Sequence, residues 1–205
     1  MVLTELISRN NQFNDLKDSF LDIENAILSS GDFQSSSVEE RLKLLHELAE
    51  FPLGRALIQD RGMNGYWTHY VCSHPSKTRS QVATNGGQQE IQPISNLERY
   101  LLEERPMALA TQERFLNFQR IAQSKIREDI HFASVPSGVM SELLFLDYSS
   151  IKNFELTGVD LDAESIKHAE QLARSFNLHE HSQFMLRDAW QLNYQQRLIF
   201  YRVVA

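Results

Sequence analysis

The stretch that decides the fold is ELTGVDLDAESIKHAEQLARSF, residues 155–176. Its first six residues predict a strand that ends at Asp160. Asp162 is a favoured N-cap residue, and the apolar residues after it recur at helical spacing. Those apolar residues are Ile166, Ala169, Leu172, Ala173 and Phe176. The stretch therefore predicts a strand, a tight turn and an amphipathic helix.

Further predicted strands lie on both sides of this unit. Residues 130–135 form a short apolar run that stops at Pro136-Ser137-Gly138, and residues 139–146 predict a helix. Residues 183–187 predict a third strand, and residues 198–204 predict a fourth. Strands that alternate with helices at this spacing are typical of parallel sheets. The fold class we expect is α/β, with a partial Rossmann-like parallel sheet of about four strands.

The preceding part of the chain, residues 1–127, predicts an all-helical N-terminal cap. Ser37 and Glu40 have the spacing of a capping box at the start of one of its helices. Residues 74–95 are rich in Ser, Thr, Asn, Gln, Gly and Pro, and we expect a long polar loop there. Residues 128–205 would then form a truncated Rossmann-like cofactor-binding domain.

Composition and charge limit the class of protein. Of the 205 residues, 42% are hydrophobic, which is enough for a sizeable core. The net charge of −7 disfavours nucleic acid as a partner, because such binding depends on Lys and Arg. No apolar run approaches the roughly 20 residues that span a membrane. The first 11 residues lack signal-peptide features, and Cys72 is the single cysteine. We expect a cytoplasmic protein that binds neither nucleic acid nor membranes.

Ligands of open α/β sheets bind beyond the C-terminal ends of the strands. The turn Ser134–Gly138 follows the first strand, and Gly138 would let the backbone approach a ligand closely. Asp160 ends the second strand, at the distance from the turn where nucleotide-binding sheets place a ribose-binding acid. Asp188 and Ala189 follow the third strand, where a carboxylate and a backbone N–H suit an adenine edge. A glycine or an acid at such a place is common by itself, so the hypothesis rests on their joint placement.

Residues 130–190 resemble the cofactor half of class I S-adenosylmethionine-dependent methyltransferases. The matching stretches are HFASVPSGVMSELL, LTGVDLDAESIKHAEQLA and FMLRDAWQL. The resemblance implies that the turn with Ser134, Pro136 and Gly138 holds the methionine part of the cofactor, and that Asp160 binds the ribose hydroxyls. It also implies that Leu161 packs on the adenine, while Asp188 and Ala189 contact the adenine amino group and a ring nitrogen.

The first motif departs from the family pattern. The family has an acid and three glycines, in a pattern like D-x-G-x-G-x-G. Aligned on Gly138, this chain has Phe132 at the acid position, and Ser134 and Pro136 at the first two glycines. Pro136 removes a backbone donor but stiffens the turn. The segment therefore resembles a variant of the motif, without the usual acid for the amino group of the cofactor.

Polar-tipped aromatic residues within residues 62–75 form the candidate substrate side. They are Tyr66, Trp67, His69 and Tyr70. The alternative is that Trp67 and Tyr70 anchor the helical cap to the sheet, since buried aromatic side chains more often pack than bind. The histidines near Cys72, and the pair His179 and His181, lack the spacing of a standard zinc site, so we expect no metal.

The resemblance implies a methyltransferase that uses S-adenosylmethionine and acts on a small molecule, with no residue nominated as catalytic. A second hypothesis is a non-catalytic remnant. In that case the helical cap would mediate self-association. The open sheet edge beyond the fourth predicted strand would offer copies of the chain a further place to pair. A third is a nicotinamide-dependent enzyme. A turn with a single glycine suits this enzyme less well than a methyltransferase. The glycine-rich turn of a dinucleotide site binds the pyrophosphate, whereas S-adenosylmethionine has no phosphate to bind.

Overall fold

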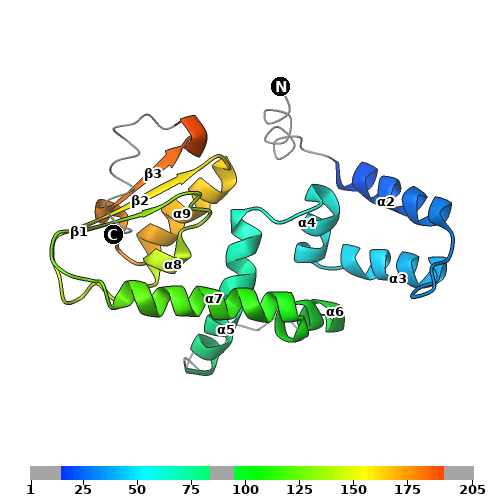
Figure 1. The fold of residues 1–205 in the computed structure, drawn as a ribbon, viewed down its shortest axis with the longest axis horizontal. Helices are drawn as coiled ribbons and strands as arrows, with labels where there is room; N and C mark the ends of the chain where they lie inside the picture. The colour runs from blue at the N-terminus through cyan, green and yellow to red at the C-terminus, as the bar shows by residue number, and fades with distance from the viewer. Residues whose placement is uncertain (1–14, 84–94, 192–205) are drawn as a thin grey trace. The chain divides into compact units, whose positions relative to one another are not determined.

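The computed structural model describes residues 15–83 and 95–191, in which helices precede a parallel sheet (Figure 1). The helices are α2 (Leu16–Ser30), α3 (Val38–Ala49), α4 (Pro52–Asp60), α5 (Gly65–Ala83), α6 (Asn96–Arg99), the π-helix η2 (Tyr100–Glu104), α7 (Pro106–Gln123), α8 (Ser141–Leu144) and α9 (Ala163–Ser175). The strands are β1 (Ile130–Ser134), β2 (Phe154–Asp160) and β3 (Ser182–Leu186), and the short 3-10 turns are η3 (His179–His181) and η4 (Ala189–Gln191). The α/β fold class predicted from the sequence is confirmed.

The helices and strands group into two compact units. Unit 1 contains α2, α3, α4, α6 and η2. Unit 2 contains α5, α7 and the sheet with its own helices. The helices α5 and α7, expected in the N-terminal cap, therefore pack with the sheet instead. Ala122 of α7 belongs to the same hydrophobic core as Phe132, which explains why a boundary at residue 127 does not separate the two packing units.

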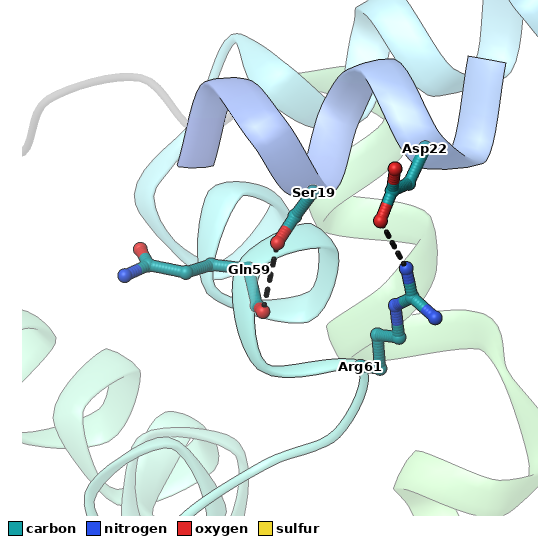
Figure 2. A network of polar contacts seen from close by, with 4 residues as sticks. All are labelled: Ser19, Asp22, Gln59 and Arg61. Carbon is teal, nitrogen blue, oxygen red and sulfur yellow. Dashed lines mark hydrogen bonds and ion pairs between the residues drawn. The ribbon is translucent and has the colours of Figure 1, made fainter. Parts of the chain in front are cut away.

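In unit 1, two polar contacts link α2 to the end of α4 (Figure 2). The hydroxyl of Ser19 donates a hydrogen bond to the carbonyl of Gln59 at 3.3 Å. The guanidinium of Arg61 lies 3.2 Å from the carboxylate of Asp22. This ion pair is exposed, so it adds little to stability. Packing of the buried Leu45, Leu53 and similar side chains is the main contribution to holding the helices of this unit together.

The capping box predicted at Ser37 and Glu40 is present at the start of α3. The Glu40 N–H donates to the Ser37 hydroxyl at 3.1 Å, and the Ser37 N–H donates to the Glu40 carboxylate at 2.8 Å. The Ser37 hydroxyl also donates to this carboxylate at 3.2 Å. The bond from the Ser37 N–H, and then the bond from the Ser37 hydroxyl, lower the pKa of Glu40 below its usual value. Two otherwise unpaired N–H groups of the helix start are thereby satisfied.

Ser37→Ala removes this cap, so we expect the free energy of unfolding to fall by about 1 kcal/mol. Urea titration followed by circular dichroism measures the change. Ser35→Ala is the control, because Ser35 is exposed and outside the capping box. Equal stability of the two variants would contradict this assignment.

In unit 2, the three strands are all parallel, in the order β1-β2-β3. The register pairs Ile130 with Phe154 and Leu156 with Ser182. One face of the sheet carries the core side chains, which pack against α8 and α9. That core includes Phe132, Phe154 and Leu156 of the strands, Leu143 and Leu144 of α8, and Ala173 of α9.

The predicted polar loop over residues 74–95 is wrong for its first ten residues, because α5 continues to Ala83. The sequence pattern did not reveal this part of the helix, and the reason is physical. Val71, Cys72 and Ser73 are all buried in succession, so no single apolar stripe marks α5. Ser, Thr and Gln carry only modest helix penalties, so a helix with a buried first half can extend through a polar stretch. Residues 84–94 lie outside the described residues.

The sheet of the described residues has three strands, where about four were expected. The predicted fourth strand, residues 198–204, lies outside the described residues. The helix expected over residues 139–146 is shortened to α8, because Met140 adopts a left-handed conformation with φ of 55°. Among the described helices, none has both the length and the apolar character needed to cross a membrane.

Candidate functional site

The loops that follow the three strands meet at Asp160. The N–H of Ser137, in the turn after β1, donates to the carbonyl of Val159 at 2.9 Å. The N–H of Gly138 donates to a carboxylate oxygen of Asp160 at 2.6 Å. The N–H of Arg187, directly after β3, donates to the carbonyl of Asp160 at 2.8 Å. The structure thus brings the first two predicted loop tips into direct contact and places the third beside them.

The carboxylate of Asp160 is held in place by backbone groups. One oxygen accepts from Gly138, and the other accepts from the N–H of Asp162 at 2.9 Å. The side chain is half-buried at the C-terminal edge of the sheet. Each carboxylate oxygen still has a lone pair that can accept a second hydrogen bond. Asp160 can therefore bind a donor such as a hydroxyl group while it keeps its internal contacts.

Gly138 is required for a reason that the sequence did not reveal. It has a positive φ of 50°, which favours glycine. A Cβ atom on Gly138 would also lie 3.2 Å from the Cα atom of Gly65. The close approach expected between Gly138 and a ligand is thus, in this structure, an approach between Gly138 and the first residue of α5.

The start of α5 is joined to the start of α9 as well as to this turn. The side-chain N–H of Asn64 donates to the Glu164 carboxylate at 3.3 Å, and the side-chain oxygen of Asn64 accepts from the backbone N–H of Trp67 at 3.0 Å. At the start of α9, Asp162 caps the helix as predicted, and its carboxylate accepts from the fully buried Ser165 hydroxyl. The turn after β1 is therefore bordered by two helix starts.

The other predicted cofactor residues lie around the same edge. Pro136 is exposed at the tip of the turn. Leu161 is 44% exposed, so its side chain is available for an apolar contact. Asp188 accepts a hydrogen bond from the N–H of Trp190 at 2.9 Å, which shapes the loop at η4. Ala189, the first residue of η4, is half-buried. These positions are compatible with a ligand that extends along the edge from β1 to β3.

The four predicted substrate residues separate into two groups. Tyr66 stacks on His168 of α9, with ring centroids 4.2 Å apart, and His69 lies against Phe145 at 5.8 Å. Trp67 makes edge contacts with Tyr66 and Tyr70. Tyr66 and His69 line a cavity of about 260 Å³, together with Val139, His168, Gln171, Leu172 and Ser175. Trp67 and Tyr70 are not among its lining residues, so only two of the four border a space for a ligand.

A second hollow, of about 620 Å³, lies at the other end of the strands. Its lining includes the polar side chains of His131, Glu155, Thr157 and Gln183. The ring of His131 lies 2.8 Å from the hydroxyl of Thr157. In the part of the chain that the structure describes, no three His, Cys, Asp or Glu side chains gather as a metal site would require.

Sequence reasoning missed Glu142. The Ser134 hydroxyl donates to its carboxylate at 2.7 Å. Burial raises the pKa of Glu142, and the bond from Ser134 only partly opposes that effect. Burial is also the main cause that raises the pKa of Cys72 and of Tyr148, and the charge of Glu142 adds to both. The signal in the sequence was an acid within the apolar run MSELLFL.

No protein-family model and no curated protein matches this sequence. A crystal structure of a possible exported protein from Bordetella parapertussis is similar, with 35% sequence identity and a TM-score of 0.70. The match covers 87% of this chain and 55% of that chain. This chain therefore spans little more than half the length of its solved relative. The cytoplasmic location expected from the sequence stays a prediction.

Proposed function

We propose that unit 2 is a Rossmann-like cofactor-binding domain that takes S-adenosylmethionine at the C-terminal edge of its sheet. The observation that carries the proposal is the contact of the turn after β1 with Asp160, beside the residue at which the loop after β3 begins. Gly138 contacts the Asp160 carboxylate and Arg187 contacts the Asp160 carbonyl. In open α/β sheets this edge is the usual place for a ligand.

The chemistry of Asp160 suits a ribose. A carboxylate accepts hydrogen bonds and donates none, and a vicinal diol supplies two O–H donors. Gly138 and Asp162 each use only one lone pair of a carboxylate oxygen. The backbone contacts also fix the orientation of the carboxylate before a ligand arrives, which lowers the entropy cost of binding.

The turn favours a ligand without phosphate. A dinucleotide site presents backbone N–H groups to the pyrophosphate at the start of a long helix. Here the Gly138 N–H donates to the Asp160 carboxylate, and α8 has only four residues. Both features favour S-adenosylmethionine over a nicotinamide dinucleotide.

We further propose that the reaction is methyl transfer to a small molecule. Held by Asp160 and the turn at Gly138, S-adenosylmethionine would supply an electrophilic methyl group, which a lone pair of the acceptor would take while the carbon–sulfur electron pair returned to sulfur. The cavity lined by Tyr66 and His69 borders Val139, the residue after Gly138, so it is a candidate acceptor site. The role of these residues would be to align the acceptor and exclude water.

The test is calorimetry with S-adenosylmethionine and with S-adenosylhomocysteine. Hydrogen bonds to a charged group contribute about 1.5–3 kcal/mol each, and 1.4 kcal/mol is tenfold in affinity. Asp160→Asn should therefore raise the Kd at least about tenfold. Asp147→Asn is the matched control, because Asp147 is an exposed carboxylate that also accepts a backbone N–H, from Ser149. Equal affinities of both variants would remove the ribose assignment.

A wild-type chain that is folded by circular dichroism but binds neither compound at millimolar concentration would overturn the proposal. Binding of NADH at this edge would favour the nicotinamide alternative. We expect no change in NADH fluorescence.

A further inference from the structure

We propose that Glu142 binds the ammonium group of the amino acid part of the ligand at this edge. The inference deepens the function proposed above and rests on it. Its basis is the position of Glu142 beside the turn, together with the finding that this half-buried carboxylate forms no ion pair with any residue that the structure describes.

Glu142 lies at the same edge of the sheet as Asp160. It is the second residue of α8, four residues after Gly138. Its carboxylate accepts from the hydroxyl of Ser134, the last residue of β1. Ser134 is opposite Gly158 in the register, two residues before Asp160. The carboxylate of Glu142 therefore lies at the end of β1, and the carboxylate of Asp160 lies at the end of β2.

Among the described residues, no Lys, Arg or His side chain forms an ion pair with the carboxylate of Glu142. Cys72 and Tyr148 lie within electrostatic reach, and neither supplies a positive charge. Arg114 acts on the thiol of Cys72 without pairing with Glu142. A buried carboxylate without a counter-charge is costly, so it favours a cationic ligand.

The proposed ligand has such a cation. Its amino acid part carries an ammonium group, and Asp160 is assigned to the ribose at the other part of the molecule. The side chain of Phe132 cannot receive the ammonium, because it is apolar and packed in the core. Glu142, fixed by Ser134, is the carboxylate that the turn after β1 does offer.

The experiment compares S-adenosylhomocysteine with 5′-methylthioadenosine, which has the same adenosine and thioether but no amino acid part. Glu142→Gln should weaken S-adenosylhomocysteine at least tenfold and leave 5′-methylthioadenosine within twofold. Asp160→Asn should weaken both. Glu170→Gln, an exposed acid on α9, is the control and should change neither.

The outcomes separate this inference from the proposed function. If the wild-type chain binds both compounds and Glu142→Gln changes both equally or neither, the assignment of Glu142 is overturned and the adenosine site stands. If the wild-type chain binds neither compound, the proposed function fails and this inference fails with it.

Stability provides a second measurement that needs no ligand. Because burial raises the pKa of Glu142, the unfolded chain loses this proton at lower pH than the folded chain does. Stability therefore falls as the pH rises above 4.5, the ordinary value, until the folded-state pKa is passed. Glu142→Gln should remove this fall and give a higher Tm at pH 7. A residue with only a structural role would give a lower Tm on substitution, and that result would overturn the proposal.

Discussion

Gly65→Ala is expected to lower the free energy of unfolding by about 3 kcal/mol, at the upper end of the cost of overpacking. The new Cβ atom would lie 2.5 Å from the Cα atom of Gly138 and 2.5 Å from the hydroxyl oxygen of Ser165. The first neighbour is backbone, and the second is fully buried and bonded to Asp162. Neither can move away cheaply, so α5 would have to shift from the turn.

Urea unfolding followed by circular dichroism measures this loss. Gly62→Ala is the control, because its Cβ would meet only one atom, the Asp60 carbonyl oxygen, at 3.8 Å. The displaced turn should also disturb the contact between Gly138 and Asp160, so the affinity for S-adenosylhomocysteine should fall together with stability. A Gly65→Ala protein as stable as the Gly62→Ala protein would show that α5 does not pack on this turn.

Phe154→Ala is expected to cost 3–5 kcal/mol, in the range of large aromatic truncations in a core. The Phe154 ring lies between two other rings. It stacks on Tyr148 with centroids 4.3 Å apart and on His181 with centroids 4.1 Å apart. The substitution therefore leaves a cavity and removes two ring contacts, each of which contributes about 0.5–1.5 kcal/mol.

Because Phe154 lies far from Asp160, a substitution of Phe154 can change stability without changing ligand binding. Phe154 begins β2, while Asp160 ends the same strand, about 20 Å away at roughly 3.3 Å per residue. Phe154→Leu should keep most of the core, lose less stability and bind S-adenosylhomocysteine like the wild type. Phe118→Ala is the control, since Phe118 is an exposed aromatic residue on α7 and should cost well under 1 kcal/mol. A loss for Phe154→Ala no larger than for Phe118→Ala would contradict the stacked core.

The elements that the sequence predicted correctly are those with local causes. The strands predicted at 130–135, 155–160 and 183–187 became β1, β2 and β3 within one residue at each end. Asp162 caps α9, and Ser37 caps α3 with Glu40. In each case the deciding residues are neighbours in the chain. Strand periodicity and side-chain capping therefore made them readable without a structure.

The placement of Asp160 was predictable for the same reason. Parallel strands bring their C-terminal ends to one edge, so an acid at the end of β2 lies beside the turn after β1. The sequence did not show that Gly138 packs against Gly65, because the two glycines are far apart in the chain. Glu142 was missed because its burial depends on packing that no local pattern encodes.

The amino-acid sequence alone predicted the α/β class, the three strands that the structure describes and the edge at which the loops after them lie. Strand, turn and cap preferences act over a few residues and leave a visible pattern. The packing of α5 and α7 with the sheet, the contact between Gly65 and Gly138, and the burial of Glu142 emerged from the folded arrangement. They depend on the fit between surfaces that are far apart along the chain, and shape complementarity of that kind leaves no periodic signal.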